Sequence, residues 1–150
     1  KNSYYLCIRV KETRSLNQLK VIRIMMYIKS VENLYKKYNG KTLADDIYVV
    51  SREYNNFQNA FNRTAKDIAA NINAELASTS KGHYDGSMFF KRGGNFVYVH
   101  YGNSTNRTTI DFDGRNICVR TAKSDRDFVG GLNNFVTLKQ LAHAIDLLLD

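Results

Sequence analysis

The sequence predicts a single α+β domain over residues 1–150, in which an antiparallel sheet packs on one face against three or four helices. Between residues 87 and 120, runs of alternating apolar and polar residues flank Gly-Gly and Asp-Gly pairs, which is typical of β-hairpins. On either side of this region, apolar residues recur every three or four positions, as they do in amphipathic helices. We therefore expect two consecutive hairpins, together with a strand at the N-terminus.

The N-terminal elements come first in the chain. Tyr4–Val10 alternates and is rich in β-formers, which predicts a strand. Ser15 is a suitable cap for a helix over Leu16–Tyr38, which Asn39-Gly40 would end. Because apolar residues surround most of its axis, we expect this helix to be buried centrally or used in self-association.

The middle of the chain contains one ambiguous segment and one clear helix. Thr42–Asp45 resembles a capping box, followed either by a short helix to about Tyr54 or by a strand at Ile47–Val50. Apolar spacing then predicts an amphipathic helix over Phe57–Ala77. The polar residues Ser78–Gly86 indicate a loop that leads into the hairpins.

The two predicted hairpins turn at Gly93-Gly94 and at Asp113-Gly114. Their strands are Ser87–Arg92, Asn95–Tyr101, Arg107–Phe112 and Arg115–Arg120. A two-residue turn sets the strand register, so the side chains sort onto two faces. The expected core face comprises Met88, Phe90, Val97, Val99, Tyr101, Ile110, Phe112, Ile117 and Val119. The opposite face comprises Phe89, Lys91, Phe96, Tyr98, His100, Thr109, Asp111, Cys118 and Arg120.

The C-terminal part of the chain predicts a loop and a final helix. Lys123–Asn134 is polar and rich in Gly and Asn, as loops are. Thr137 is a suitable cap for the helix that follows. Its expected inward-facing residues are Leu138, Leu141, Ala142, Ile145, Leu148 and Leu149.

Charge points to an anionic partner. The net charge is +8, and residues 1–40 alone carry nine Lys or Arg residues against two Glu residues, a local net charge of +7. Such an asymmetry indicates a nucleic acid, an acidic protein surface or anionic lipid as the partner.

The cysteines and the hydropathy pattern predict a cytoplasmic protein without a cofactor. Cys7 and Cys118 lie far apart and have no ligand spacing, so we expect free thiols and no metal site. Nothing at the N-terminus resembles a signal peptide. The longest apolar run, Val21–Ile28, is too short to span a membrane and contains Arg23.

A nucleic-acid site on the polar sheet face is the most specific hypothesis. Aromatic side chains can stack on unpaired bases while cations contact phosphates. The predicted residues are Phe89, Lys91, Arg92, Phe96, Tyr98, His100, Arg107 and Arg120. The alternative is that a helix covers this face too, so that its aromatic residues form a second layer of core.

The basic N-terminal helix is a second candidate contact surface. Four of its cations could touch phosphates: Lys20, Arg23, Lys36 and Lys37. The alternative is an ordinary solvated helix face.

Catalysis is the weaker hypothesis. Cys118, His100 and Asp111 share one face, and His83-Tyr84-Asp85 could act as an acid–base pair. Asp111 and Asp113 have the spacing of some metal-binding carboxylates, although the turn already explains Asp113.

The sequence therefore predicts a non-catalytic basic binding domain, with nucleic acid as the favoured partner. The alternative is a protein–protein interaction module, such as a small phage or mobile-element protein that inhibits a host complex. A homodimer through the apolar N-terminal helix belongs to this alternative. The salt dependence of binding distinguishes the two hypotheses, because phosphate contacts weaken steeply as the salt concentration rises and apolar contacts do not.

Overall fold

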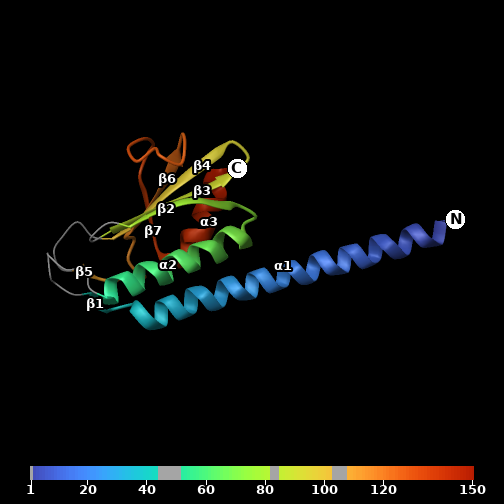
Figure 1. The fold of residues 1–150 in the computed structure, drawn as a ribbon, viewed down its shortest axis with the longest axis horizontal. Coiled ribbons are helices and arrows are strands. Elements are labelled where there is room, and N and C mark those ends of the chain that lie inside the picture. The colour runs from blue at the N-terminus through green and yellow to red at the C-terminus, as the bar shows by residue number, and fades with distance from the viewer. Residues whose placement is uncertain (1, 44–51, 82–84, 103–107) are drawn as a thin grey trace.

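The computed structural model describes residues 2–43, 52–81, 85–102 and 108–150, and it confirms the α+β class (Figure 1). Among these residues, three helices accompany a five-stranded antiparallel sheet and a separate two-stranded sheet. The elements are α1 (Asn2–Tyr38), β1 (Thr42–Leu43), α2 (Arg52–Asn71), β2 (Glu75–Lys81), β3 (Asp85–Arg92), β4 (Asn95–Gly102), β5 (Thr108–Thr109), β6 (Ile117–Ala122), β7 (Asn134–Val136) and α3 (Leu138–Leu149).

The first predicted hairpin is confirmed. Strands β3 and β4 pair with Arg92 opposite Asn95, which leaves Gly93 and Gly94 as the two-residue turn. Gly93 has a φ of 59°, a value that glycine adopts without steric cost. The local sequence was sufficient here because the turn and both strands are adjacent in the chain.

The second predicted hairpin is wrong. Strand β5 pairs with β1 instead, and β6 pairs with β4 on one side and β7 on the other, which gives the order β2-β3-β4-β6-β7. The carboxylate of Asp111 accepts hydrogen bonds from the backbone N–H groups of Asp113 and Gly114, which bends the chain away from a hairpin path. Ile110 also exchanges backbone hydrogen bonds with the Gly40–Lys41 segment, so this stretch is held at the end of α1.

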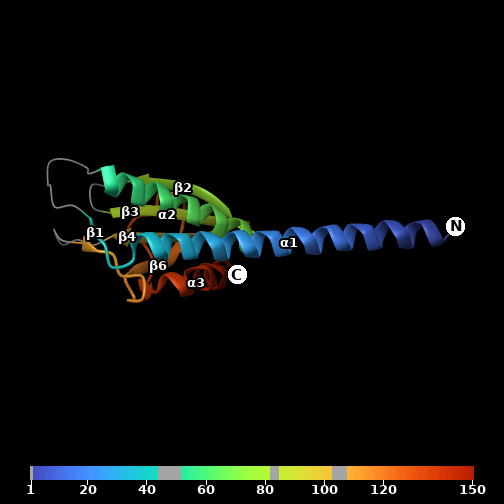
Figure 2. The same ribbon diagram turned by 90° about the horizontal axis from the view of Figure 1, so that it is seen from below.

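The predicted N-terminal strand is also wrong, because Tyr4–Val10 lies within α1. Figures 1 and 2 show the N-terminal part of α1 extending beyond the rest of the molecule, away from the sheet, while its C-terminal part lies beside α2. A strand there would have no neighbour to pair with, whereas a helix satisfies its own backbone hydrogen bonds. The predicted end of the helix, at Asn39-Gly40, is confirmed, and Gly40 has a φ of 76°.

Three boundaries in the middle of the chain differ from prediction. Thr42 lies in β1 and caps no helix, while the rest of the ambiguous segment, residues 44–51, lies outside the described residues. Helix α2 begins at Arg52 and ends at Asn71, so the predicted Phe57–Ala77 is displaced toward the N-terminus. Strand β2 takes up the first four residues of the predicted polar loop, Ser78–Lys81, and β3 begins before the loop was predicted to end. Strand β2 is an edge strand, where polar side chains can face solvent.

The core lies between the five-stranded sheet and the helices on one of its faces (Figure 1). All nine predicted core-face residues are buried. The ring of Phe61 from α2 stacks on Tyr101 from β4, with 3.9 Å between centroids. The predicted cap of α3 is confirmed, since Thr137 and Gln140 form a reciprocal capping box.

Among the side chains of α1 that the structure describes, those in the core lie in its C-terminal part, from Tyr27 to Tyr38. Leu34 and Tyr38 are buried, and Tyr38 meets Phe57 of α2 edge-on at 5.2 Å. The Ser30 hydroxyl donates to the Thr64 hydroxyl at 3.1 Å. Ser30 precedes Tyr38 in α1, whereas Thr64 follows Phe57 in α2, so the two helices run antiparallel. The predicted central burial of α1 is therefore wrong for Leu16–Ile28, where eight large apolar side chains are exposed. Toward its N-terminus α1 extends past the end of α2 (Figure 2).

Candidate interaction surfaces

A loop covers part of the sheet face that was predicted to bind nucleic acid. Residues 123–133, here called the covering loop, follow β6 and place the ring of Phe128 edge-on against Phe89 at 5.2 Å and against Tyr98 at 6.1 Å. Phe89 is consequently only 1% exposed. A loop takes the place of the helix that the alternative envisaged, and Phe89 is second-layer core.

Arg120 is tied to the covering loop. Its side chain is 3% exposed, and its guanidinium lies 4.3 Å from the centroid of the Tyr98 ring. The two terminal nitrogens donate to the carbonyl oxygens of Thr121, at 3.1 Å, and Asp127, at 2.7 Å. A phosphate could reach Arg120 only if the covering loop moved.

Asp127 organises the covering loop from within. Its carboxylate accepts backbone N–H groups from Lys123 at 2.9 Å, from Gly130 at 2.8 Å and from Val129 at 3.3 Å. The hydrogen bonds from Lys123 and Gly130 lower the pKa of Asp127 below its ordinary value. Sequence reasoning missed this role, although an Asp three residues before a Gly is a recognisable turn signal.

The other predicted sheet-face residues of β3 and β4 share this face, and the rings of Tyr98 and His100 stack with 6.4 Å between their centroids. The Lys91 ammonium lies 5.4 Å from the centroid of the Phe96 ring, and both side chains are partly exposed, as are Tyr98 and His100. Arg107 lies outside the described residues. Because Phe89 is buried beneath Phe128 of the covering loop, the predicted set does not form one open aromatic platform in this structure.

Arg92 has structural partners at the end of the domain. Its guanidinium contacts the carboxylates of Asp146 and Asp150, both at 2.8 Å, and donates to the carbonyl oxygen of Ile72 at 3.0 Å. These contacts join the first hairpin to α3 and to the end of α2. A phosphate contact at Arg92 would compete with two carboxylates.

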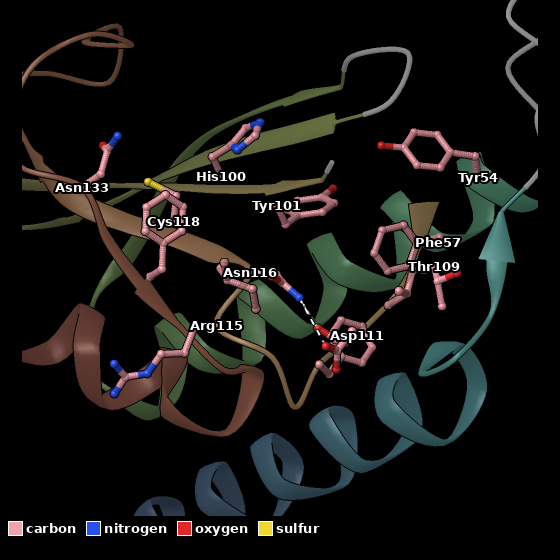
Figure 3. Close-up of a pocket in the computed structure, with 14 residues that line it drawn as sticks. Tyr54, Phe57, His100, Tyr101, Thr109, Asp111, Arg115, Asn116, Cys118 and Asn133 are labelled. Carbon is pink, nitrogen blue, oxygen red and sulfur yellow. Dashed lines mark hydrogen bonds between the residues drawn. The ribbon is translucent and has the colours of Figure 1, made fainter. Parts of the chain in front are cut away.

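A cavity of about 460 Å³ brings together the three residues of the catalytic hypothesis (Figure 3). His100 and Cys118 face each other across β4 and β6, and Asp111 also lines the cavity. Figure 3 shows Asp111 beside Asn116, separate from His100 and Cys118. The remaining lining residues are Tyr54, Phe57, Tyr101, Thr109, Ile110, Phe112, Arg115, Ile117, Asn133 and Phe135.

The chemistry of this cavity does not favour a nucleophile. Burial raises the pKa of the Cys118 thiol, and the nearby Arg120 opposes that shift only in part, whereas reactive cysteines need a lowered pKa. The Asp111 carboxylate is engaged in its own turn. We therefore assign no catalytic step to this cavity.

The structure also bears on the remaining acid–base and metal candidates. Asp113 accepts a hydrogen bond from the Tyr35 hydroxyl and lies 3.9 Å from the Lys139 ammonium. Within the described part of the chain, no group of three or more His, Cys, Asp or Glu residues could hold a metal ion. His83 and Tyr84 lie outside the described residues.

The N-terminal cations are exposed, but they lie on different sides of α1. Tyr27 and Val31 pack against the core, and steps of three and four residues back along the helix from them reach Lys20 and Arg23. These two cations therefore lie on the side of α1 that faces α2, although both precede the first core-packed residue, Tyr27. Lys36 lies on the side opposite α2, and Lys37 approaches the ring of Tyr38 at 5.2 Å. These four residues do not form a single stripe.

Among the residues whose burial the structure describes, the largest group of neighbouring exposed apolar side chains lies on α1. Its members are between 38% and 65% exposed, and together they are Leu16, Leu19, Val21, Ile22, Ile24, Met25, Met26 and Ile28. From Ser30 opposite Thr64, the antiparallel register places the last residue of α2, Asn71, level with about residue 23 of α1. We call Leu16–Ile28 the apolar segment of α1. No helix in the described ranges combines the length and hydropathy needed to cross a membrane.

Comparison with known protein-family models, curated protein sequences and solved structures gives no match to this chain.

Proposed function

We propose that this chain is a non-catalytic protein-interaction module whose contact surface is the apolar segment of α1. The observation that carries the proposal is the exposure of eight large apolar side chains within thirteen consecutive residues. Contiguous apolar patches of this kind are rare on monomeric proteins and commonly mark interaction sites.

The stability of α1 supports the same proposal. Most helical stability in proteins comes from tertiary packing, and isolated helices are marginal in water. The C-terminal part of α1 packs on α2, whereas Leu16, Val21 and Met25 are each more than half exposed. A partner that covered these residues would supply the packing that the domain itself does not.

The distribution of apolar residues favours helices as the partner surface. A helix that lies on a membrane surface has one apolar face and an opposite polar face. In the apolar segment, by contrast, apolar side chains point to all sides of the axis, and the cations Lys20 and Arg23 interrupt only one of them. A helix of this type is usually surrounded by other helices.

Nucleic-acid binding is the second candidate. It is supported by the net charge of +8 and by the exposure of Lys20, Arg23, Lys36 and Lys37. It is weakened by the burial of Phe89, because a stacking platform needs open rings. Binding through α1 cations alone would be electrostatic and would weaken steeply with salt.

Photocrosslinking tests the proposal directly. A photoreactive phenylalanine analogue would replace Met25 in the apolar segment. The matched control would replace Lys36, which is also exposed and lies three helical turns further along the same side. We expect protein adducts from position 25 in the cells that express the chain, and far fewer from position 36.

Two outcomes would overturn the proposal. One is that position 25 gives nucleic-acid adducts in place of protein adducts, which would favour the second candidate. The other is that positions 25 and 36 give the same protein adducts at the same yield, which would mean that the apolar segment has no dedicated partner.

A further inference from the structure

The cavity shown in Figure 3 is large enough to hold a small molecule. Its volume of about 460 Å³ lies within the range of natural ligand pockets, which is roughly 300–1,000 Å³. A cavity of roughly 150 Å³ is already sufficient to bind a benzene molecule. The space therefore admits a molecule of two fused rings together with its hydrogen-bonding groups.

Part of the cavity wall consists of aromatic rings that hold one another in place. Tyr54 and Phe57 come from α2 and Tyr101 comes from β4, and each of these residues is at most 6% exposed. The ring of Phe57 meets that of Tyr101 edge-on at 5.6 Å and lies 6.1 Å from that of Tyr54. Fixed rings of this kind favour a planar aromatic ligand, which they can contact by offset stacking or edge-on.

The cavity opens to solvent on the side of β7. Figure 3 shows Tyr54 and Phe57 at one end of the cavity and Cys118 and Asn133 at the other. Phe135 lies opposite Cys118 in the pairing of β6 with β7 and is 52% exposed, and Asn133 is exposed as well. A ligand that entered here would pass between an aromatic ring and a side-chain amide.

The hydrogen-bonding groups of the cavity suit a ligand that has both donors and acceptors. Asn116 and Asn133 carry amides, each with a donor and an acceptor. The Asn116 amide nitrogen donates to the carbonyl oxygen of Asp111 at 3.3 Å, which leaves the amide oxygen to accept. A few polar groups in an otherwise apolar pocket orient a ligand and give specificity.

The charged residues of the cavity do not favour an ionic ligand. Asp111 and Arg115 both line the cavity, and their charges are opposite. The Asp111 carboxylate already accepts the backbone N–H groups of Asp113 and Gly114. Figure 3 shows the Arg115 guanidinium pointing away from the ring of Tyr101. Because neither sign of charge is in excess, a neutral ligand fits best.

We infer that this cavity binds a neutral, planar heteroaromatic molecule of about two fused rings. Its ring lies against Phe57 and Tyr101, and its polar edge faces Asn116 and Asn133. This binding is additional to the proposed function and does not depend on it, because none of the residues that line the cavity belongs to α1.

An NMR titration of the full chain with isotope-labelled isoleucine methyl groups tests the inference. The probe is benzimidazole, which is neutral near pH 8, planar and bicyclic, with one donor and one acceptor. Ile110 and Ile117 line the cavity, whereas Ile145 is buried in α3 and does not. We expect saturable shifts of the Ile110 and Ile117 methyl resonances in the millimolar range or below, and none at Ile145.

Two comparison ligands test the chemical class. Cyclohexanol has a donor and an acceptor but no planar ring, and naphthoate is planar and bicyclic but anionic. We expect both to bind about tenfold more weakly than benzimidazole, which for cyclohexanol is the size of effect that aromatic pairing accounts for. Equal or tighter binding of cyclohexanol would overturn the aromatic assignment, and equal or tighter binding of naphthoate would overturn the neutral one.

Matched variants test the location. Phe135→Ala and Asn133→Ala should each weaken benzimidazole binding about two- to tenfold, through loss of an aromatic contact and of a hydrogen bond. The controls are Phe128→Ala, at a residue that is also 52% exposed, and Asn134→Ala, at the next residue of the chain. Neither Phe128 nor Asn134 lines the cavity, so both controls should bind as the wild type does. All four positions are exposed, so the domain should stay folded in every variant.

Other results would overturn the inference. The absence of saturable shifts at Ile110 and Ile117 would show that the cavity does not bind this class of molecule. Equal effects of the cavity variants and their controls would show that the probe binds elsewhere. Neither result bears on the proposed function, which photocrosslinking at Met25 tests separately.

Discussion

Arg120 holds the covering loop against the sheet by donating a hydrogen bond to the carbonyl oxygen of Asp127 at 2.7 Å. The same guanidinium lies over the ring of Tyr98, which it helps to cover. One side chain that the sequence suggested for phosphate binding is therefore part of the packing of the domain. This contact leads to the first prediction.

Replacing Arg120 with Ala should destabilise the domain by about 1–3 kcal/mol, because two carbonyl oxygens lose their donor and the Tyr98 ring loses its cation. Urea unfolding would measure the change. Arg126→Ala, at an exposed position in the same loop, should stay within about 0.5 kcal/mol of wild type. Equal effects of the two substitutions would contradict a specific role for Arg120.

The covering loop should loosen in acid. The pKa of Asp127 in the folded protein is lowered by the N–H groups of Lys123 and Gly130. Its contribution to stability is therefore complete above the unfolded-state pKa of about 3.9, and it is lost as the pH falls through the lower folded-state value. The amide resonances of Lys123 and Gly130 in an NMR titration should shift together below that pH. A midpoint at or above the ordinary Asp value would refute the prediction.

Gly131→Ala should destabilise the domain by about 2 kcal/mol, because Gly131 has a φ of 82°, which costs other residues about 1–2 kcal/mol. An added Cβ would also lie 2.5 Å from the carbonyl oxygen of Thr121. Gly94→Ala is the control, since the space around Gly94 is open. Thermal unfolding would compare them, and an equally mild effect at both sites would argue against a close approach of the loop to β6.

Thr137→Ala should cost about 1 kcal/mol, because the Thr137 side chain accepts the backbone N–H of Gln140 at the start of α3. Thr137→Ser keeps the hydroxyl and should retain most of this stability. Guanidinium unfolding of the three proteins would make the comparison. If Thr137→Ser were as destabilising as Thr137→Ala, the loss of stability would come from the missing methyl group and not from the missing cap hydrogen bond.

The sequence by itself determined the elements whose information is local. The hairpin at Gly93-Gly94 needs only its turn and two adjacent strands, and α3 needs only the Thr137 cap and its apolar spacing. The alternation of β3 and β4 likewise assigned Phe90 and Val97 to the core. In each case, one short segment contains both the sequence pattern that predicts the element and the residues that form it.

Tertiary structure decided the pairings between distant segments and the exposure of the two candidate surfaces. Whether Thr109 pairs across a hairpin or with Thr42 depends on where the end of α1 lies, which no local pattern specifies. Arg120 is buried because Asp127 offers it a carbonyl oxygen. Met25 is exposed because it lies on a side of α1 that faces away from α2, and no other described element covers that side. Periodicity states which side chains share a face, but only the arrangement of the other elements determines what covers that face.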